Sequence, residues 1–296
     1  QSQGDYDEAS RQYQEVLETS RHLLGNEHDL TLNVINNIGS LLLDTGKYDE
    51  AITYFKEALD TRRSLFGNEH PDTLISIGNL GVAFYLNDDY DDAMRYISEE
   101  LEISRRILGN EHPETLSSIN NMANLLQVLD PEKALPLYKE ALGTRLRVLG
   151  EEHTRTLNSM NNLGYLLHKQ RNYDEAEKYY ERALEVRRRT LGNNHPDTLL
   201  SINNMGSLLE DQGHLSKAEP YYREVFELRS KVLQKEHPHL LISIHNLGSL
   251  LLRQEKYDEA KPYLLESLAL NRKTLGDNHL NTLLSIGNMA AWYKRQ

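Results

Sequence analysis

The chain contains no cysteine, and among its 296 residues only one is tryptophan and four are phenylalanine. Without cysteine it can form neither disulfide bonds nor a zinc site with thiolate ligands, which fits a reducing compartment and predicts a cytoplasmic protein. Long hydrophobic runs are missing too. No stretch approaches the ~20 apolar residues that a membrane-spanning helix needs, so we expect no membrane partner.

Positive charge is also scarce, because 33 Lys and Arg residues face 45 Asp and Glu residues and give a formal net charge of −12. Phosphate backbones repel an acidic chain, which argues against a nucleic-acid partner. The motifs of common active sites do not occur: there is no Gly-rich phosphate loop, no His-Glu-x-x-His and no Gly-x-Ser-x-Gly. We therefore expect neither an enzyme nor a cofactor.

One pattern, in contrast, recurs seven times along the chain. It reads roughly Leu-Gly-x-x-His-Pro-x-Thr-Leu, then Asn-Asn-Leu-Gly, then Tyr-Asp-Glu-Ala. Its histidines follow one another at steps of 42 residues, with a single step of 41: His28, His70, His112, His153, His195, His237 and His279. A fixed period of this size predicts a repeat array, whose core grows with each added repeat.

Each repeat holds two amphipathic segments. Within residues 73–86, Leu74, Ile77 and Leu80 recur at spacings of three, which places them on one face of an α-helix. Residues 90–108 show the same kind of periodicity, and no segment shows the sustained alternation of a strand. The pattern predicts an all-α protein, an α-solenoid of antiparallel helix pairs.

The repeat also predicts the domain organisation, a single array over residues 1–296. Residues 1–29 would form the second helix of an incomplete repeat, residues 30–275 six complete helix pairs, and residues 276–296 the first helix of a truncated repeat. No linker or low-complexity segment interrupts the array.

The recurring histidines raise the question of a metal site. Metal ligands all lie ~2 Å from one ion, whereas packed helices lie ~8–10 Å apart, so residues repeated once per helix pair do not converge. We interpret the histidines as residues at helix starts that bond to the backbone, and we expect no metal.

A family resemblance rests on a set of packing residues and on the period. The residues follow the pattern of tetratricopeptide (TPR) repeats: Leu163, Gly164, Tyr173, Ala176, Tyr180 and Ala183. The long period and the sequence Arg-x-x-x-Leu-Gly-x-x-His-Pro resemble the extended TPRs of kinesin light chains. The resemblance implies a right-handed superhelix, with the first helices lining a concave groove that binds an extended peptide.

Two neighbouring rows of residues on the first helices carry the binding hypothesis. One row is constant: Asn37, Asn79, Asn121, Asn162, Asn204, Asn246 and Asn288. The residue before each varies: Asn36, Gly78, Asn120, Asn161, Asn203, His245 and Gly287. Asparagine amides both donate and accept hydrogen bonds, so such a row can pair with a peptide backbone, as the resemblance implies. Alternatively the asparagines tie adjacent helices together; we favour the tie for the constant row and the groove for the variable one.

Other variable positions of the first helices are expected to supply specificity, although ordinary surface variation is the alternative. The complete candidate groove set is Asn36, Asn79, Tyr85, Asn120, Asn121, Asn124, Asn161, Asn162, Tyr165, His168, Asn203, Asn204, His245 and Asn246.

Arginines recur near the ends of the second helices: Arg62, Arg63, Arg105, Arg106, Arg145, Arg187, Arg188 and Arg189. Cations at this end of a helix complement its dipole. We favour that interpretation over a patch that binds nucleic acid.

Two functions from different classes follow. The first is an interaction scaffold or adaptor that binds a protein or peptide partner in the concave groove. The second is a structural module that self-associates head to tail, because the sequence begins with an expected second helix and closes with an expected first helix, two halves that complement each other. Joining Gln296 to Gly4 continues the repeat with its ordinary spacing.

Overall fold

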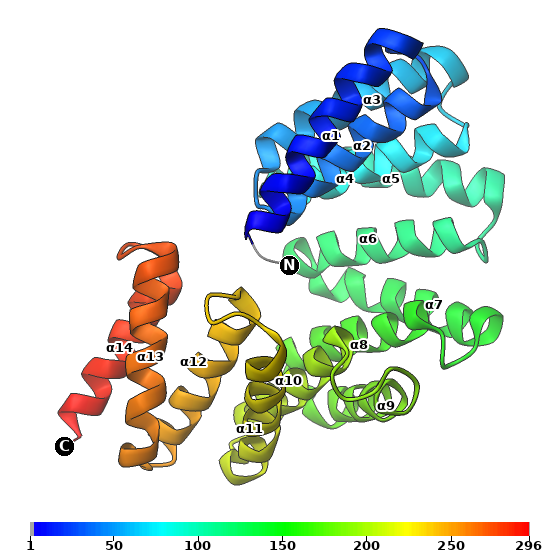
Figure 1. The fold of residues 1–296 in the computed structure, drawn as a ribbon. Coiled ribbons are helices and arrows are strands. Elements are labelled where there is room, and N and C mark those ends of the chain that lie inside the picture. The colour runs from blue at the N-terminus through cyan, green and yellow to red at the C-terminus, as the bar shows by residue number, and fades with distance from the viewer. Residues whose placement is uncertain (1–2, 296) are drawn as a thin grey trace. The chain divides into compact units, whose positions relative to one another are not determined.

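The computed structural model describes residues 3–295, which form fourteen α-helices and no β-strand within that range. The helices fall into two compact units, residues 1–150 and residues 151–296, which we describe one at a time. The first holds α1 (Gln3–Leu24), α2 (Asp29–Asp44), α3 (Tyr48–Phe66), α4 (Pro71–Leu86), α5 (Tyr90–Leu108), α6 (Pro113–Leu129) and α7 (Pro131–Leu149) (Figure 1). The second holds α8 (Thr154–Lys169), α9 (Tyr173–Leu191), α10 (Pro196–Asp211), α11 (Leu215–Val232), α12 (Pro238–Arg253), α13 (Tyr257–Leu275) and α14 (Leu280–Lys294) (Figure 1).

Within each unit the helices pack in chain order. Every first helix contacts the second helix that follows it, as α4 contacts α5, and every second helix contacts the next first helix, as α5 contacts α6. In Figure 1 these helices form successive hairpins. The packing confirms the predicted all-α solenoid architecture.

The seven recurring histidines are the N-cap residues of α2, α4, α6, α8, α10, α12 and α14. In each, Nδ1 accepts a hydrogen bond from the backbone N–H two residues further on, at 3.1–3.2 Å. A ring nitrogen accepts only where it carries no proton, so the cap uses the unprotonated Nδ1. The expectation that these histidines begin helices and bond to the backbone is confirmed.

The Leu-Gly element of the repeat has a packing cause. A Cβ atom on Gly164 of α8 would lie 2.8 Å from the ring of Tyr180 in α9. Gly206 and Tyr222 make the same approach in α10 and α11, again at 2.8 Å. The missing side chain therefore lets the second helix bury an aromatic ring directly against the first helix.

Candidate peptide-binding surface

In the second unit, the two asparagine rows hydrogen bond to each other across neighbouring first helices. Asn204 of α10 donates from Nδ2 to Oδ1 of Asn161 in α8 at 2.8 Å. Asn246 of α12 donates from Nδ2 to Oδ1 of Asn203 in α10 at 3.1 Å. The constant asparagine therefore reaches back to the variable one of the preceding pair, which is the tie between helices that the sequence analysis favoured for the constant row.

Burial differs along the candidate set. Asn36 and Asn161 are buried, and Asn36 donates to Ser76 Oγ at 3.5 Å. The remaining asparagines of the set are half-buried, as are Tyr85 and His245: Asn79, Asn120, Asn121, Asn124, Asn162, Asn203, Asn204 and Asn246.

His245 stands where α8 and α10 carry the variable asparagines Asn161 and Asn203. Burial lowers the pKa of His245, and the nearby Glu210 carboxylate opposes that shift. Its imidazole is therefore biased toward the neutral form. Neutral imidazole has one hydrogen-bond donor and one acceptor, and so, like an asparagine amide, it can both donate and accept.

Tyrosine hydroxyls from the second helices hold a further row of the first helices. Tyr138 Oη of α7 donates to Asn124 Oδ1 at 2.6 Å and lies 3.2 Å from Gln127 Oε1. Tyr222 Oη of α11 donates to Glu210 Oε2 at 2.8 Å. Burial is the first cause of the raised pKa of Tyr222, with the Glu210 charge the next, so the phenol stays protonated as the donor.

Sequence reasoning missed these tyrosine contacts, because it assigned the tyrosines to packing alone. A comparison of positions contains the signal. The repeats with Phe55 or Leu264 in place of the tyrosine carry Leu43 or Leu252 where Gln127 and Glu210 stand, whereas the repeat with Ile97 carries Tyr85 there.

Tyr165 and His168 of the candidate set lie one turn apart on α8 but differ in exposure. Tyr165 is 40 % exposed, and Lys169 Nζ lies 5.3 Å from the centroid of its ring. His168 is only 5 % exposed, and its Nε2 lies 2.9 Å from Asp211 Oδ2 of α10. The structure thus places Tyr165 at the surface and His168 as a link between two first helices.

The arginine prediction needs a correction at three of its positions. Arg62, Arg145 and Arg187 are buried, and Arg187, at 1 % exposure, donates to Ser201 Oγ at 2.6 Å and to Asn158 Oδ1 at 2.5 Å. Burial lowers the pKa of Arg187. Arg62 and Arg187 each join their own second helix to the first helices on both sides, and Arg145 donates to the backbone oxygen of Leu116 in α6. Surface positions such as Arg105 lie in the last turn of their helices, as predicted.

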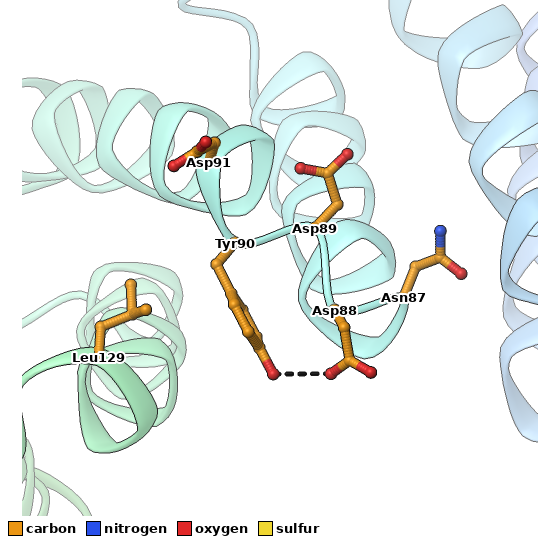
Figure 2. A pocket seen from close by; sticks show the side chains of 6 residues that line it. All are labelled: Asn87, Asp88, Asp89, Tyr90, Asp91 and Leu129. Atoms are coloured by element: carbon orange, nitrogen blue, oxygen red, sulfur yellow. Dashed lines mark hydrogen bonds between the residues drawn. The ribbon is translucent and has the colours of Figure 1, made fainter.

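One surface cavity, of about 560 Å³, lies in the first unit and is not part of these rows. Figure 2 shows its lining, which is Asn87, Asp88, Asp89, Tyr90, Asp91 and Leu129, with Tyr90 Oη donating to Asp88 Oδ1 at 2.7 Å.

Within residues 3–295 no group of three or more His, Cys, Asp or Glu side chains is arranged to hold a metal ion. In the same part of the chain, no helix combines the length and the apolar character needed to cross a bilayer.

Comparison with known proteins assigns the family. The sequence profile described as "Tetratricopeptide repeat" matches residues 1–64, 31–99, 85–147, 125–184, 155–231 and 240–296. No curated protein sequence matches the chain.

Solved structures agree with that assignment. A putative kinesin light chain from Podosopora anserina with nearly identical TPR-like repeats has 25 % identity and a TM-score of 0.60, over 70 % of this chain and 99 % of its own. BtubC (BKLC) from P. vanneervenii has 24 % identity and a TM-score of 0.63, over 76 % and 91 %. A Rap protein complexed with Competence and Sporulation Factor has 15 % identity and a TM-score of 0.67, over 97 % and 80 %, and shows the fold alone. The chain belongs to the tetratricopeptide repeat family, and its structural neighbours include kinesin light chain-like repeat proteins.

Proposed function

We propose that this chain is a cytoplasmic, non-enzymatic adaptor that binds an extended peptide segment of a partner protein along the first helices of a unit. The observation that carries the proposal is the pair of asparagine–asparagine hydrogen bonds, Asn204 to Asn161 and Asn246 to Asn203. A tetratricopeptide solenoid generally mediates protein–protein interactions, and one neighbour of the same fold was solved in complex with Competence and Sporulation Factor.

The hydrogen bonds between asparagines are compatible with peptide binding, because an amide group can form more than one hydrogen bond. Each bond uses one of the two N–H groups of the donor and one of the two lone pairs of the acceptor. The amides retain further donors and acceptors for a ligand. The bond also fixes their orientation before binding, which lowers the entropy lost when a peptide is captured.

The spacing of the first helices suits an extended ligand. Packed helices lie ~8–10 Å apart and an extended chain advances ~3.3–3.6 Å per residue, so one amide position per helix pair meets roughly every third peptide residue. Backbone recognition of this kind sets affinity. The variable neighbours, such as the exposed Tyr165, would set sequence preference.

A display selection tests the proposal. The chain is panned against a random-peptide library beside a variant with Asn120, Asn161 and Asn203 changed to Ala. Asn193 and Asn194 lie exposed between α9 and α10, so the variant with both changed to Ala is the matched control. We expect the unchanged chain and the control to enrich the same peptides. The variant with the three asparagines of the first helices changed should not enrich them, although its circular dichroism shows that it is still helical. No enrichment by the unchanged, folded chain would remove the proposed function.

Head-to-tail self-association is a second candidate, favoured by apolar side chains on α14. Leu283, Leu284 and Tyr293 are all exposed there, and their side chains would supply surface for a second copy. We expect the sedimentation coefficient to rise with protein concentration, and to rise less in a Leu284→Gln variant. A strict monomer at high concentration contradicts this candidate.

A further inference from the structure

In the first unit, the pair formed by α4 and α5 differs from the pairs before and after it at two facing positions, one on each helix. At the position of Glu100 in α5, the pairs before and after carry Ala58 and Ala141. At the facing position of α4, those pairs carry Asn36 and Asn120, whereas this one carries Gly78. The long acid therefore comes from the second helix, and the amide of the variable row is missing.

The two substitutions fit together in space. A Cβ atom on Gly78 would lie 2.8 Å from both Cδ and Oε1 of Glu100. The carboxyl group thus packs directly beneath the backbone of α4, at the place in the variable row where Asn36 and Asn120 carry amides. A side chain at position 78 would have to displace the carboxyl end of Glu100 from the place it occupies here.

The carboxyl group of Glu100 is buried and incompletely partnered. The residue is 7 % exposed; Ser118 Oγ of α6 donates to its Oε1 at 2.6 Å. Its other oxygen, Oε2, is buried without a hydrogen-bond partner within residues 3–295. Burial raises the pKa of Glu100 to about 7, and the Ser118 hydrogen bond opposes that shift only in part.

The pair formed by α4 and α5 also lacks a buried arginine. Where four other second helices bury Arg62, Arg145, Arg187 and Arg229, α5 carries Ser104, and α1 and α13 likewise carry the uncharged Ser20 and Asn271. In the second unit Arg187 donates to the serine of the next first helix, Ser201, which corresponds to Ser118 here. Glu100 takes over the hydrogen bond to that serine, so a carboxylate occupies a neighbourhood that elsewhere holds a guanidinium. Among the described residues no cation pairs with it.

Apolar side chains lie on α4 on either side of the buried Gly78. Ile75 is 44 % exposed and Val82 is half-buried, one turn before and one turn after Gly78. The aliphatic stem of a lysine or an arginine packs well on such side chains while its charged end reaches a buried acid. A cation that arrives there meets a carboxylate in low-dielectric surroundings, where their attraction is stronger than in water.

We propose that Glu100 is a specificity-determining residue that pairs with a lysine or arginine side chain of a peptide bound along α2, α4 and α6, an inference that rests on the proposed function. The basic side chain supplies the cation that the helix pair itself lacks. Gly78 leaves only main chain between the carboxyl group and the peptide, and the flexible glutamate side chain turns toward the ligand from beneath it.

The test compares peptide preferences of the unchanged chain and a Glu100→Ala variant. Alanine is the residue of the equivalent positions Ala58, Ala141 and Ala183, where the facing first helices carry asparagine in place of Gly78. We expect the unchanged chain to enrich peptides with a lysine or arginine at a fixed position, and the variant to enrich peptides without that preference. Equal preferences in both proteins overturn the inference.

A double-mutant cycle on one enriched peptide sharpens the result. Replacing its basic residue by glutamine should weaken binding to the unchanged chain at least tenfold and binding to Glu100→Ala less than twofold. Equal weakening in both proteins overturns the inference while the adaptor function stands. If the unchanged chain enriches no peptide at all, the proposed function fails, and this inference with it.

Discussion

At the scale of single residues, Glu100 couples stability to pH. Burial raises its pKa from 4.5 to about 7 in the folded chain. The unfolded chain therefore releases this proton first, and the stability contributed by the neutral carboxyl is present below about pH 4.5 and lost as the pH rises to about 7. A shift of this size corresponds to about 3 kcal/mol at most.

Glu100→Gln removes this titration and keeps the shape of the side chain. We expect the free energy of unfolding of the variant to exceed that of the unchanged chain at pH 8, and the difference to shrink or vanish at pH 4. Urea unfolding at the two pH values measures it, and all other titrating groups cancel in the comparison. A difference that does not change with pH would show that the carboxyl is not the buried acid described here.

The residue scale also shows where sequence reasoning succeeds. The histidine caps followed from a local signal, a histidine that recurs before each first helix and precedes Pro in four of the seven, and the structure has all seven of them. The contact between Gly78 and Glu100 did not follow, nor did the hydroxyl bond from Tyr222 to Glu210. Both contacts join residues on different helices, which the pattern along a single helix does not show.

At the scale of helices, the close approach within a pair depends on glycine. Gly164→Ala adds a methyl group 2.8 Å from the Tyr180 ring, and overpacking of this kind costs about 1–3 kcal/mol. Gly143, inside α7, has nothing within 4 Å of its missing Cβ, so Gly143→Ala should instead stabilise the chain by about 0.5–1 kcal/mol through helix propensity. Urea unfolding of both variants measures the two changes in the free energy of unfolding. Stabilisation by both substitutions contradicts the packing account.

Helix existence was predictable because each helix carries its own apolar face. The interior role of Arg187 was not predicted, although Arg187 lies four residues after Ala183 on the buried face of α9 and the exposed Arg189 does not. The arginine was assigned to the surface because of its charge. Its partners Ser201 and Asn158 belong to the neighbouring helices, and the pattern of α9 alone does not name them.

At the scale of the whole molecule, the constant period predicted the solenoid before any residue was assigned a role. The binding rows are a different matter. The sequence places the asparagines on one helix position, but whether an amide ties helices or meets a ligand depends on bonds that extend between neighbouring pairs. In the second unit those bonds exist, and we propose that the same side chains both tie the helices and bind the peptide.

The most direct test of that central claim is a calorimetric titration of one enriched peptide into three folded proteins: the unchanged chain, Asn161→Ala with Asn203→Ala, and the control Asn193→Ala with Asn194→Ala. We predict that the control binds within twofold of the unchanged chain and that the variant with Asn161 and Asn203 changed binds at least about fivefold more weakly, because each of the two lost hydrogen bonds is worth about 0.5–1.5 kcal/mol. Equal affinity for all three proteins would contradict the claim that the asparagine rows bind the peptide.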